Sequence, residues 1–315
     1  MVQFSVLVLL YNAKRPALEG TLRSILLQED ASYEIILADD GSQNDCLMWA
    51  EEYLKANGCR DYKVSTHENM GTVKNILLAL TPAEGKYVKP LGTGDFFFDT
   101  HVLRDVWEAM EGQESVMCFG RMLGYDEGGQ THAVRLPNDL AAFYKQDKHR
   151  VKMNMIVHQH WVVGADNFYL REAFARYLQK LDGKVIYCED MVQLFFFLED
   201  VPVTYMERPL ILYECASGVS TQRGSAAFKR MVKDLLEGFT VLKEDYPKDY
   251  YVNKGWRMAL CQQTINRPLL AIRILLCDPG YYGMLFRTAL QAKYYRVEGE
   301  GMLRELLHTG TDPRS

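Results

Sequence analysis

The sequence has no long apolar run that would cross a membrane. Its longest later apolar stretch, Pro268–Cys277, is too short to span a bilayer and contains Arg273. The N-terminus begins directly with the apolar segment Phe4–Leu10, without a basic leader or a small-residue cleavage site. We therefore expect neither a membrane-spanning helix nor a signal peptide.

The sequence also has no CxxC pair and no Cys/His cluster at the spacing of a zinc site. Its cysteines are odd in number and scattered, which argues against a disulfide framework and favours a reduced, cytoplasmic chain. They are Cys46, Cys59, Cys118, Cys188, Cys215, Cys261 and Cys277.

There is no excess of basic charge to suggest a nucleic-acid partner, because 36 Lys and Arg face 41 Asp and Glu. The charge is uneven, however, with 15 basic against 10 acidic side chains in residues 220–315. Residues 251–297 combine seven Lys or Arg with a single acid, Asp278, and many aromatic and aliphatic side chains. This region is either a basic surface that rests on anionic lipid or a helical subdomain or dimer contact.

What is present is a globular chain of 315 residues, 48% hydrophobic and 24% charged, without repeats or low-complexity tracts. The length fits one large domain, or one domain with a sizeable appendage. We expect a catalytic domain over residues 1–221, with halves 1–100 and 101–221, and a helical region over 222–315.

The first hundred residues alternate between the two hydrophobic periods, which is typical of βα units. Leu18, Leu22, Ile25 and Leu26 recur at helical spacing, as do Val73, Ile76, Leu77 and Leu80. Strands joined by helices require crossover connections, so the pattern predicts a mostly parallel sheet with helices on both faces. The predicted strands are Phe4–Leu10, Tyr33–Ala38, Tyr62–Thr66 and Lys86–Pro90.

Later segments are mixed, and then helical. We expect a strand over 115–124, a polar loop-rich insertion over 125–155, two helices around Gly183 within 171–200, and helices from Gln222 onward. Pro247, Pro268 and Pro279 are the predicted helix breakers.

Polar or flexible residues follow each of the first four predicted strands. Ligands of such sheets bind beyond the carboxyl ends of the strands, so these tips are candidate binding loops. Taken singly each has a structural alternative, since Asp39 and Asp40 also suit a turn or a helix cap. The tips are Tyr11-Asn12, Asp39-Asp40-Gly41-Ser42, Glu68-Asn69-Met70-Gly71 and Gly92-Thr93-Gly94-Asp95.

These motifs, in this order, resemble the inverting family 2 glycosyltransferases with the GT-A fold. The nucleotide-sugar half is matched by SVLVLLYN, LEGTLRSILLQ, YEIILADDGSQND, ENMGTVKNILLAL and GKYVKPLGTGDFF. The acceptor half is matched by GADNFYLRE, YCEDMVQLFF and YECASGVST. The similarity covers about residues 3–221, and it implies a transferase that uses a nucleotide-activated sugar, with a helical C-terminal extension.

The resemblance implies a donor site at the strand tips. It places Tyr11, with Asn12 beside it, as the platform for the nucleobase, although a tyrosine at a strand end also packs structurally. Asp40 matches the position that hydrogen-bonds a pyrimidine, and Asp39 adjoins it. A family segment near the nucleotide is matched by Asn69, Gly71 and Asn75, with Lys74 where a basic residue is common.

The metal motif departs from the family pattern. Where a DxD or doubled Asp is usual, this chain has Gly92-Thr93-Gly94-Asp95, so only Asp95 remains as the implied ligand of Mn²⁺ or Mg²⁺. One carboxylate with substrate phosphates and water is chemically sufficient for such a cation. The missing acids therefore bear on the affinity for the metal more than on the activity.

The resemblance places the catalytic base in Glu189-Asp190, with Asp190 at the matching position. A positioned carboxylate that removes the acceptor proton contributes on the order of 10²–10⁴ in rate. The structural alternative is a pair of helix-N-terminal acids favoured by the helix dipole. Weaker candidates for diphosphate or acceptor contacts are Arg223, His158, His160 and Trp161.

We therefore expect transfer of a sugar from a nucleotide sugar, most simply a UDP-sugar, to a glycan or lipid-linked glycan of surface polysaccharide biosynthesis. The expected location is cytoplasmic, with peripheral contact at the inner face of the membrane left open, as is the oligomeric state. The alternative is a degenerate GT-A protein that binds nucleotide or glycan without turnover, because Gly92 and Gly94 replace acids. A dinucleotide-binding oxidoreductase is excluded, since no GxGxxG follows the first strand.

Overall fold

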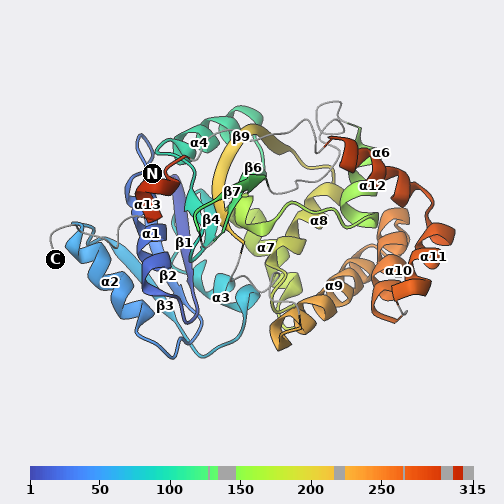
Figure 1. The fold of residues 1–315 in the computed structure, drawn as a ribbon, viewed down its shortest axis with the longest axis horizontal. Helices are drawn as coiled ribbons and strands as arrows, with labels where there is room; N and C mark the ends of the chain where they lie inside the picture. Colours follow the sequence, from blue (N-terminus) through green and yellow to red (C-terminus); the bar gives the residue numbers. More distant parts are fainter. Residues whose placement is uncertain (127, 134–146, 216–223, 265–266, 292–300, 308–315) are drawn as a thin grey trace.

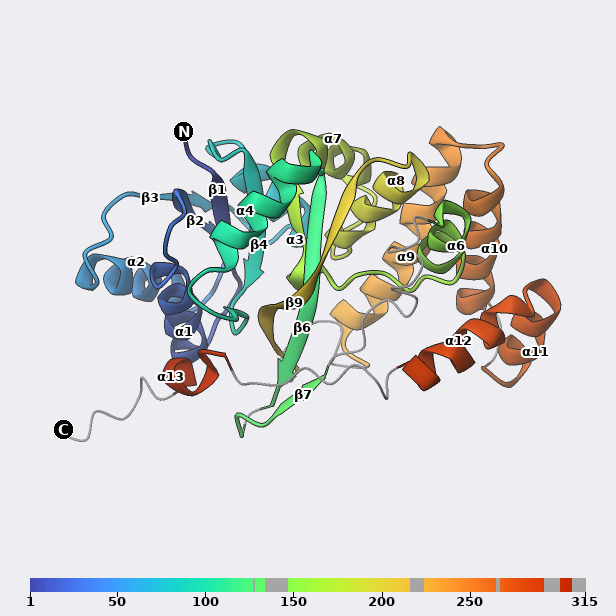
Figure 2. The same ribbon diagram turned by 90° about the horizontal axis from the view of Figure 1, so that it is seen from above.

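The computed structural model describes residues 1–126, 128–133, 147–215, 224–264, 267–291 and 301–307 (Figure 1). The described strands form one nine-stranded sheet in the order β3-β2-β1-β4-β8-β6-β9-β5, with β7 paired to β6. Helices cover both faces of the sheet, and further helices extend from one end of it (Figures 1 and 2). The predicted α/β architecture with a helical C-terminal part is confirmed.

The N-terminal half of the sheet is parallel, as the βα alternation predicts. The four strands lie within two residues of their predicted bounds, and β1 pairs with β2 on one side and β4 on the other. The elements are β1 (Phe4–Leu10), α1 (Arg15–Leu26), β2 (Tyr33–Asp39), α2 (Cys46–Ala56), β3 (Tyr62–Thr66), α3 (Thr72–Ala79) and β4 (Tyr87–Gly92).

The second half of the sheet is mixed, which the hydrophobic pattern did not show. β8 pairs antiparallel with β4 and β6, β5 pairs antiparallel with β9, and β6 and β9 run parallel. The elements are β5 (Phe96–Phe97), α4 (Val102–Gln113), β6 (Met117–Tyr125), β7 (Thr131–Ala133), α6 (Lys148–Lys152), β8 (Phe168–Leu170), α7 (Arg171–Leu181), α8 (Val192–Leu198) and β9 (Val203–Glu214).

The strands of the parallel half are apolar throughout because both faces of the sheet are covered. Along β1, Val6 and Val8 face a core with α1, α2 and α4, whereas Leu7 between them faces a second core with α3, α7 and α8. This alternation follows from the two-residue period of a strand. Packing on both faces holds the carboxyl ends of the parallel strands in place along one edge of the sheet.

The C-terminal part is helical, as predicted, and packs in two places. α9 (Ala226–Asp245) and α10 (Tyr250–Thr264) join the core that contains α7 and α8, and α11 (Arg267–Cys277) and α12 (Gly280–Gln291) extend the molecule beyond them (Figure 1). The final helix α13 (Leu303–Leu307) lies instead beside α1, at the other end of the molecule (Figures 1 and 2).

None of the helices in the described part of the chain is long and apolar enough to cross a membrane. The cysteines whose side chains are described are free thiols. The predicted boundary at residue 221 lies outside the described residues.

Candidate functional site

The loops that follow β1 and β2 are tied together by Asn12. Its backbone is left-handed, with φ of 51°, and its Oδ1 accepts a hydrogen bond of 2.7 Å from the N–H of Gln43. Its own N–H donates to Ser42 Oγ at 3.0 Å. Tyr11 is 54% exposed beside it, so an aromatic ring stands at the edge of the sheet without being packed into the core.

The two aspartates at the end of β2 are buried, and both accept hydrogen bonds from neighbouring loops. Asp40 accepts from the N–H groups of Met70 and Gly71 at 2.7 and 2.9 Å. Asp39 accepts from Ser42 N–H at 3.3 Å and from Thr66 Oγ1 at 3.2 Å. Since an ionised carboxylate has about four acceptor sites, both retain capacity for a ligand while fixing the loop geometry.

Gly71 is required by the close approach of the segment that precedes Glu189. Its φ is +87°, and a Cβ there would lie 2.2 Å from Ile186 Cγ2, so no other residue fits without rearrangement. Asn69, two residues earlier, is exposed. This contact brings the loop after β3 and the segment before Glu189 together at residue 71.

Asn75 and Lys74 are occupied within the protein. The buried Asn75 donates through Nδ2 to the carbonyl of Ala38 at 3.0 Å, and its Oδ1 lies 3.1 Å from His67 Nε2. Lys74 forms an ion pair of 2.8 Å with Asp182. Asn75 therefore supports the end of β2 through the Ala38 carbonyl, and the Lys74 ammonium is engaged by Asp182, the residue that follows α7.

Asp95 lies in the turn between β4 and β5, and only 8% of it is exposed. Burial raises the pKa of its carboxyl to about 7, and the N–H of Glu214 and the charge of Lys89 only partly oppose that effect. The Glu214 N–H donates to Asp95 Oδ1 at 3.1 Å. The end of β9 is thereby fixed against the predicted metal ligand.

The two glycines that replace family acids leave space that carboxylates border. A Cβ on Gly92 would lie 3.1 Å from Asp95 Oδ2, and a Cβ on Gly94, whose φ is +99°, would lie 3.2 Å from Glu214 Oε2. Glu214, at the end of β9, the strand that pairs with β5, thus lies beside the position from which an acid is missing. Sequence reasoning did not identify Glu214, because it lies 119 residues from Asp95.

Asp190 lies in a short 3₁₀ turn, Glu189–Met191, that leads into α8. The turn packs against Gly164, where a Cβ would lie 2.7 Å from Glu189 Oε1 and 3.3 Å from Asp190 Cβ. Both acids touch solvent but are surrounded by protein atoms. This desolvation raises the pKa of Asp190 to about 7 and that of Glu189 to about 8, the latter aided by the charge of Asp190.

The segment that carries this turn is held from behind by α9. Asp234, fully buried, accepts from the N–H groups of Ile186 and Tyr187 at 3.0 and 2.7 Å and forms an ion pair of 2.8 Å with Arg230. Burial raises the pKa of Tyr187, with smaller contributions from Asp40 and Tyr11. The C-terminal helical part therefore positions the predicted base, and Tyr187 lies within electrostatic reach of the nucleotide loops.

A fully buried lysine joins the two halves of the site. Lys89 Nζ donates to the carbonyls of Ala165 and Asn167, the second at 3.3 Å, and lies 4.7 Å from the centroid of the Phe168 ring. Burial lowers the pKa of this ammonium to about 8, against the opposing charges of Asp166, Asp95 and Glu189. Its sequence signal is a lysine in the middle of the apolar strand YVKPLG.

The weaker candidates lie farther along the acceptor side. His158 forms a buried pair of 2.8 Å with Asp278, and His160 packs its ring on Tyr281 at 6.3 Å. Burial lowers the pKa of His160 to about 4. Trp161 donates to a backbone carbonyl at 2.7 Å and packs near the core. Arg223 lies outside the described residues.

Together these groups make an acidic site around one buried cation. In the described part of the chain no cluster of three or more metal-binding side chains occurs, so a cation here would depend on two carboxylates and on ligand oxygens. The space beside Gly92 and Gly94 and the hard oxygen donors of Asp95 and Glu214 fit such a cation. Asp190, whose carboxyl has a pKa of about 7, is suited to accept a proton.

Comparison with known proteins gives a family and a fold. A family model described as Glycosyl transferase family 2 matches residues 5–181. No curated protein sequence matches the chain.

Two solved structures share the fold over most of their length. S. aureus TarS 1-349 is 17% identical, with a TM-score of 0.52 over 94% of this chain and 93% of that one, and it has also been solved with UDP-GlcNAc. The mannosyltransferase PcManGT from Pyrobaculum calidifontis, solved with GDP-Man and Mn²⁺, is 15% identical, with a TM-score of 0.53 over 93% of this chain and 87% of that one. The sheet of this chain is therefore of the GT-A type.

Proposed function

Because this chain belongs to glycosyl transferase family 2, we propose that it moves a sugar from a nucleotide-diphosphate sugar to a hydroxyl group, with inversion at the anomeric carbon. The observation that supports this most directly is the packing of the Glu189–Asp190 turn on Gly164, together with a buried Lys89 that interacts electrostatically with both Glu189 and Asp95. The candidate proton acceptor and the candidate metal ligand therefore share the neighbourhood of one buried cation.

Asp190 is the proposed base. It takes the proton of the acceptor hydroxyl as that oxygen bonds to the anomeric carbon, and the bond from this carbon to the diphosphate breaks, with the electron pair leaving on the diphosphate. A pKa near 7 leaves much of the carboxyl ionised at neutral pH and basic enough to accept the proton. Attack from the face opposite the diphosphate gives inversion.

The proposed donor is a UDP-sugar, held at the strand tips. The exposed Tyr11 stacks on the base, and Asp40 uses its remaining acceptor capacity for a ring N–H. Asn12, Asp39, Asn69, Gly71 and Asn75 form or support the loops around it. The neighbours with UDP-GlcNAc and GDP-Man support a nucleotide-sugar donor, with both a pyrimidine and a purine to be tested.

The proposed metal is Mn²⁺ or Mg²⁺, with Asp95 as its ligand and Glu214 as the second carboxylate. When bound, a divalent cation at this position would neutralise charge that develops on the diphosphate. The Mn²⁺ in the mannosyltransferase structure supports this choice of ion. Asp95 keeps Oδ2 for a cation, because Oδ1 already accepts the Glu214 N–H.

The proposed acceptor is a glycan or lipid-linked glycan of polysaccharide biosynthesis, at a cytoplasmic site with peripheral membrane contact through the C-terminal region. His158, His160, Trp161 and Arg223 remain candidate contacts on the acceptor or diphosphate side. The acidic turn at Glu189 and Asp190 favours a neutral hydroxyl over an anionic group as the attacking partner, because like charges repel.

The first experiment is calorimetric titration with UDP, GDP, CDP and dTDP, each with and without Mn²⁺, followed by donor hydrolysis with the matching sugar nucleotides. Metal-enhanced binding of one diphosphate, together with hydrolysis, supports the proposal. Asp95→Ala and Glu214→Gln should each weaken the metal enhancement, while Glu207→Gln, an exposed acid on the same strand, should not. Binding without hydrolysis or transfer would favour the degenerate binding protein.

A further inference from the structure

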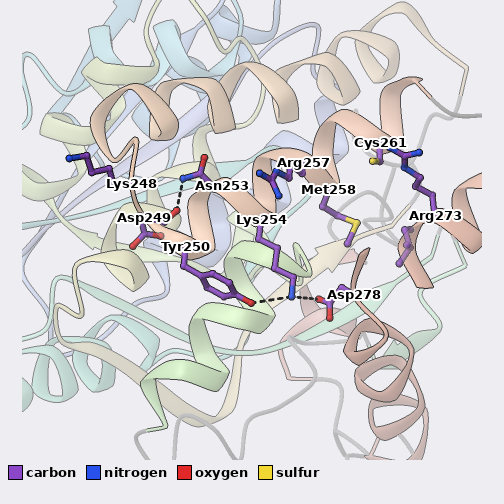
Figure 3. A pocket seen from close by; sticks show the side chains of 11 residues that line it. Lys248, Asp249, Tyr250, Asn253, Lys254, Arg257, Met258, Cys261, Arg273 and Asp278 are labelled. Carbon is purple, nitrogen blue, oxygen red and sulfur yellow. Dashed lines mark hydrogen bonds and ion pairs between the residues drawn. The ribbon is translucent and has the colours of Figure 1, made fainter. Parts of the chain in front are cut away.

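A second concave site lies at the far end of the molecule from the nucleotide loops. A cavity of about 740 Å³ is lined by residues of α10 and α11 and of the segments that flank them (Figure 3). Figure 3 shows Lys254 reaching between the Tyr250 hydroxyl, at 3.3 Å, and the Asp278 carboxylate, at 3.5 Å. The cavity is therefore walled in part by polar side chains, one of which, Asp278, pairs with the candidate acceptor contact His158.

The cavity is basic. Four cations line it, Lys248, Lys254, Arg257 and Arg273, against two acids. Both acids are engaged: Asp278 pairs with His158 at 2.8 Å and with Lys254, and Asp249 accepts the N–H of Val252 at 2.9 Å.

The two arginines differ from the other charged residues of the cavity. Both are exposed, and neither Arg257 nor Arg273 makes a hydrogen bond or ion pair within the part of the chain that the structure describes. A guanidinium presents five N–H donors in a planar fork that suits phosphate oxygens. These two residues thus offer donors for an anion with several oxygens.

An apolar face adjoins the cavity. On α11, the side chains of Leu269, Ile272, Leu275 and Leu276 are 51–77% exposed, and Phe286 on α12 is 67% exposed. At about 100° per residue, the four α11 positions fall within one arc of the helix, with Arg273 at its edge. Helix α11 carries no acidic residue. A continuous exposed face of this kind is unusual in a soluble monomer and marks an interaction surface.

We propose that this cavity and the exposed face of α11 and Phe286 form a docking site for an anionic phospholipid surface, with a lipid phosphate in the cavity. The arrangement is that of an interfacial helix, which buries apolar side chains at the headgroup boundary and directs cations to anionic lipid. Charge complementarity selects this occupant over a neutral membrane. The inference rests on the proposed function, because it places a transferase beside a lipid-linked acceptor.

The structure also connects this surface to the catalytic turn. The pair of His158 with Asp278 fastens the start of α12 to the segment that leads to Gly164, on which Glu189 and Asp190 pack. The membrane-facing helices and the acceptor side of the site are therefore one packed unit. An acceptor anchored in the same bilayer would approach the site from this side.

The test is co-sedimentation of the full chain with phosphatidylcholine vesicles, with and without phosphatidylglycerol. We expect binding only to the anionic vesicles, at least partly reversed by salt. Arg257→Ala with Arg273→Ala should lower the partition coefficient about 25-fold, at about fivefold per arginine. Ile272→Gln with Leu276→Gln should lower it about tenfold or more.

A matched control carries Arg60→Ala and Met48→Ala, two exposed positions at or just after α2, at the opposite end of the molecule. It should bind vesicles as the wild type does. Because all six positions are exposed, each variant should fold and should bind UDP with unchanged affinity, which separates this test from the donor site. Failure of the wild-type chain to bind UDP would count against the proposed function and would leave the docking site untouched.

Three results would overturn the docking site. One is wild-type chain that stays in the supernatant with anionic vesicles. The second is vesicle binding that is equal in the wild type and in both double variants. The third is loss of glycerol phosphate binding in Arg257→Ala with Arg273→Ala without any loss of vesicle binding, which would mean that the cavity takes a soluble phosphate and not a lipid surface.

Discussion

Replacing Asp190 by Asn tests the chemistry that the site geometry suggests. Asparagine has the same shape and keeps the turn, which is held by Gly164 and by the backbone bonds to Asp234, but it cannot accept a proton. Loss of a positioned base costs on the order of 10²–10⁴ in rate, or roughly 3–5 kcal/mol in the barrier. Donor affinity should be nearly unchanged, because the donor loops do not depend on this side chain.

The pH dependence of turnover gives an independent test of Asp190 as the base. With a pKa of about 7, the carboxyl of Asp190 is mostly ionised at pH 8 and mostly protonated at pH 6. Since the base must be ionised, turnover should rise with pH through about 7, by about tenfold between pH 6 and pH 8. The Asp190→Asn variant should lose this rise when the divalent cation is saturating, because the bound cation keeps Asp95 ionised and residue 190 no longer titrates.

Glu189→Gln is the matched control for both measurements. Burial and the charge of Asp190 raise the pKa of Glu189 and favour its neutral form, so the neutral Gln should preserve a rise of turnover with pH. The assay is release of nucleoside diphosphate at saturating donor, across buffers of constant ionic strength. The reasoning is refuted if Asp190→Asn retains turnover within about tenfold of the wild type, or if it keeps the pH-dependent rise.

Other substitutions test how the site is held. Gly71→Ala should lower the free energy of unfolding, measured by urea titration, by about 3 kcal/mol, because the added Cβ would overlap Ile186 and the φ of residue 71 is +87°. Gly183→Ala should lower it by only about 1 kcal/mol, because residue 183 has a similar φ of +77° but open space around it. Equal costs would contradict the assigned contact. Asp234→Ala should reduce kcat up to about 100-fold with little change in donor KM, since it loosens the segment before the base; a change confined to KM would disprove this role. Lys89→Met should lower the free energy of unfolding by roughly 3–5 kcal/mol, because it leaves the buried acids Asp166, Asp95 and Glu189 without a neighbouring cation. An unchanged urea unfolding curve would show that these acids are neutral when Lys89 is absent.

Much of the fold follows from local signals. The βα alternation is legible because each parallel strand is buried on both faces and each helix on one, which imposes different periods on the same chain. The resemblance also identified Asp95 and the pair Glu189-Asp190 before their surroundings were known. Whether those residues have the proposed roles stays a prediction for the experiments above.

Several features were beyond local reasoning. The antiparallel pairing of β8 with β4 and β6 depends on which strands meet, and strands of two or three residues carry too little pattern to show it. Asp39, Asp40 and Asn75 were expected at the nucleotide, and the structure adds that they hold neighbouring loops in place.

The sequence by itself determined the parallel N-terminal half of the sheet, the polar strand tips and the family, because these depend on residue order and short-range periodicity. Only the tertiary structure decided that Glu214 stands beside Gly94, that Lys89 is surrounded by acids from three segments, and that α9 supports the base through Asp234. The physical reason is that burial and charge proximity are set by contacts between residues as many as 282 positions apart, and a linear pattern does not encode such distances.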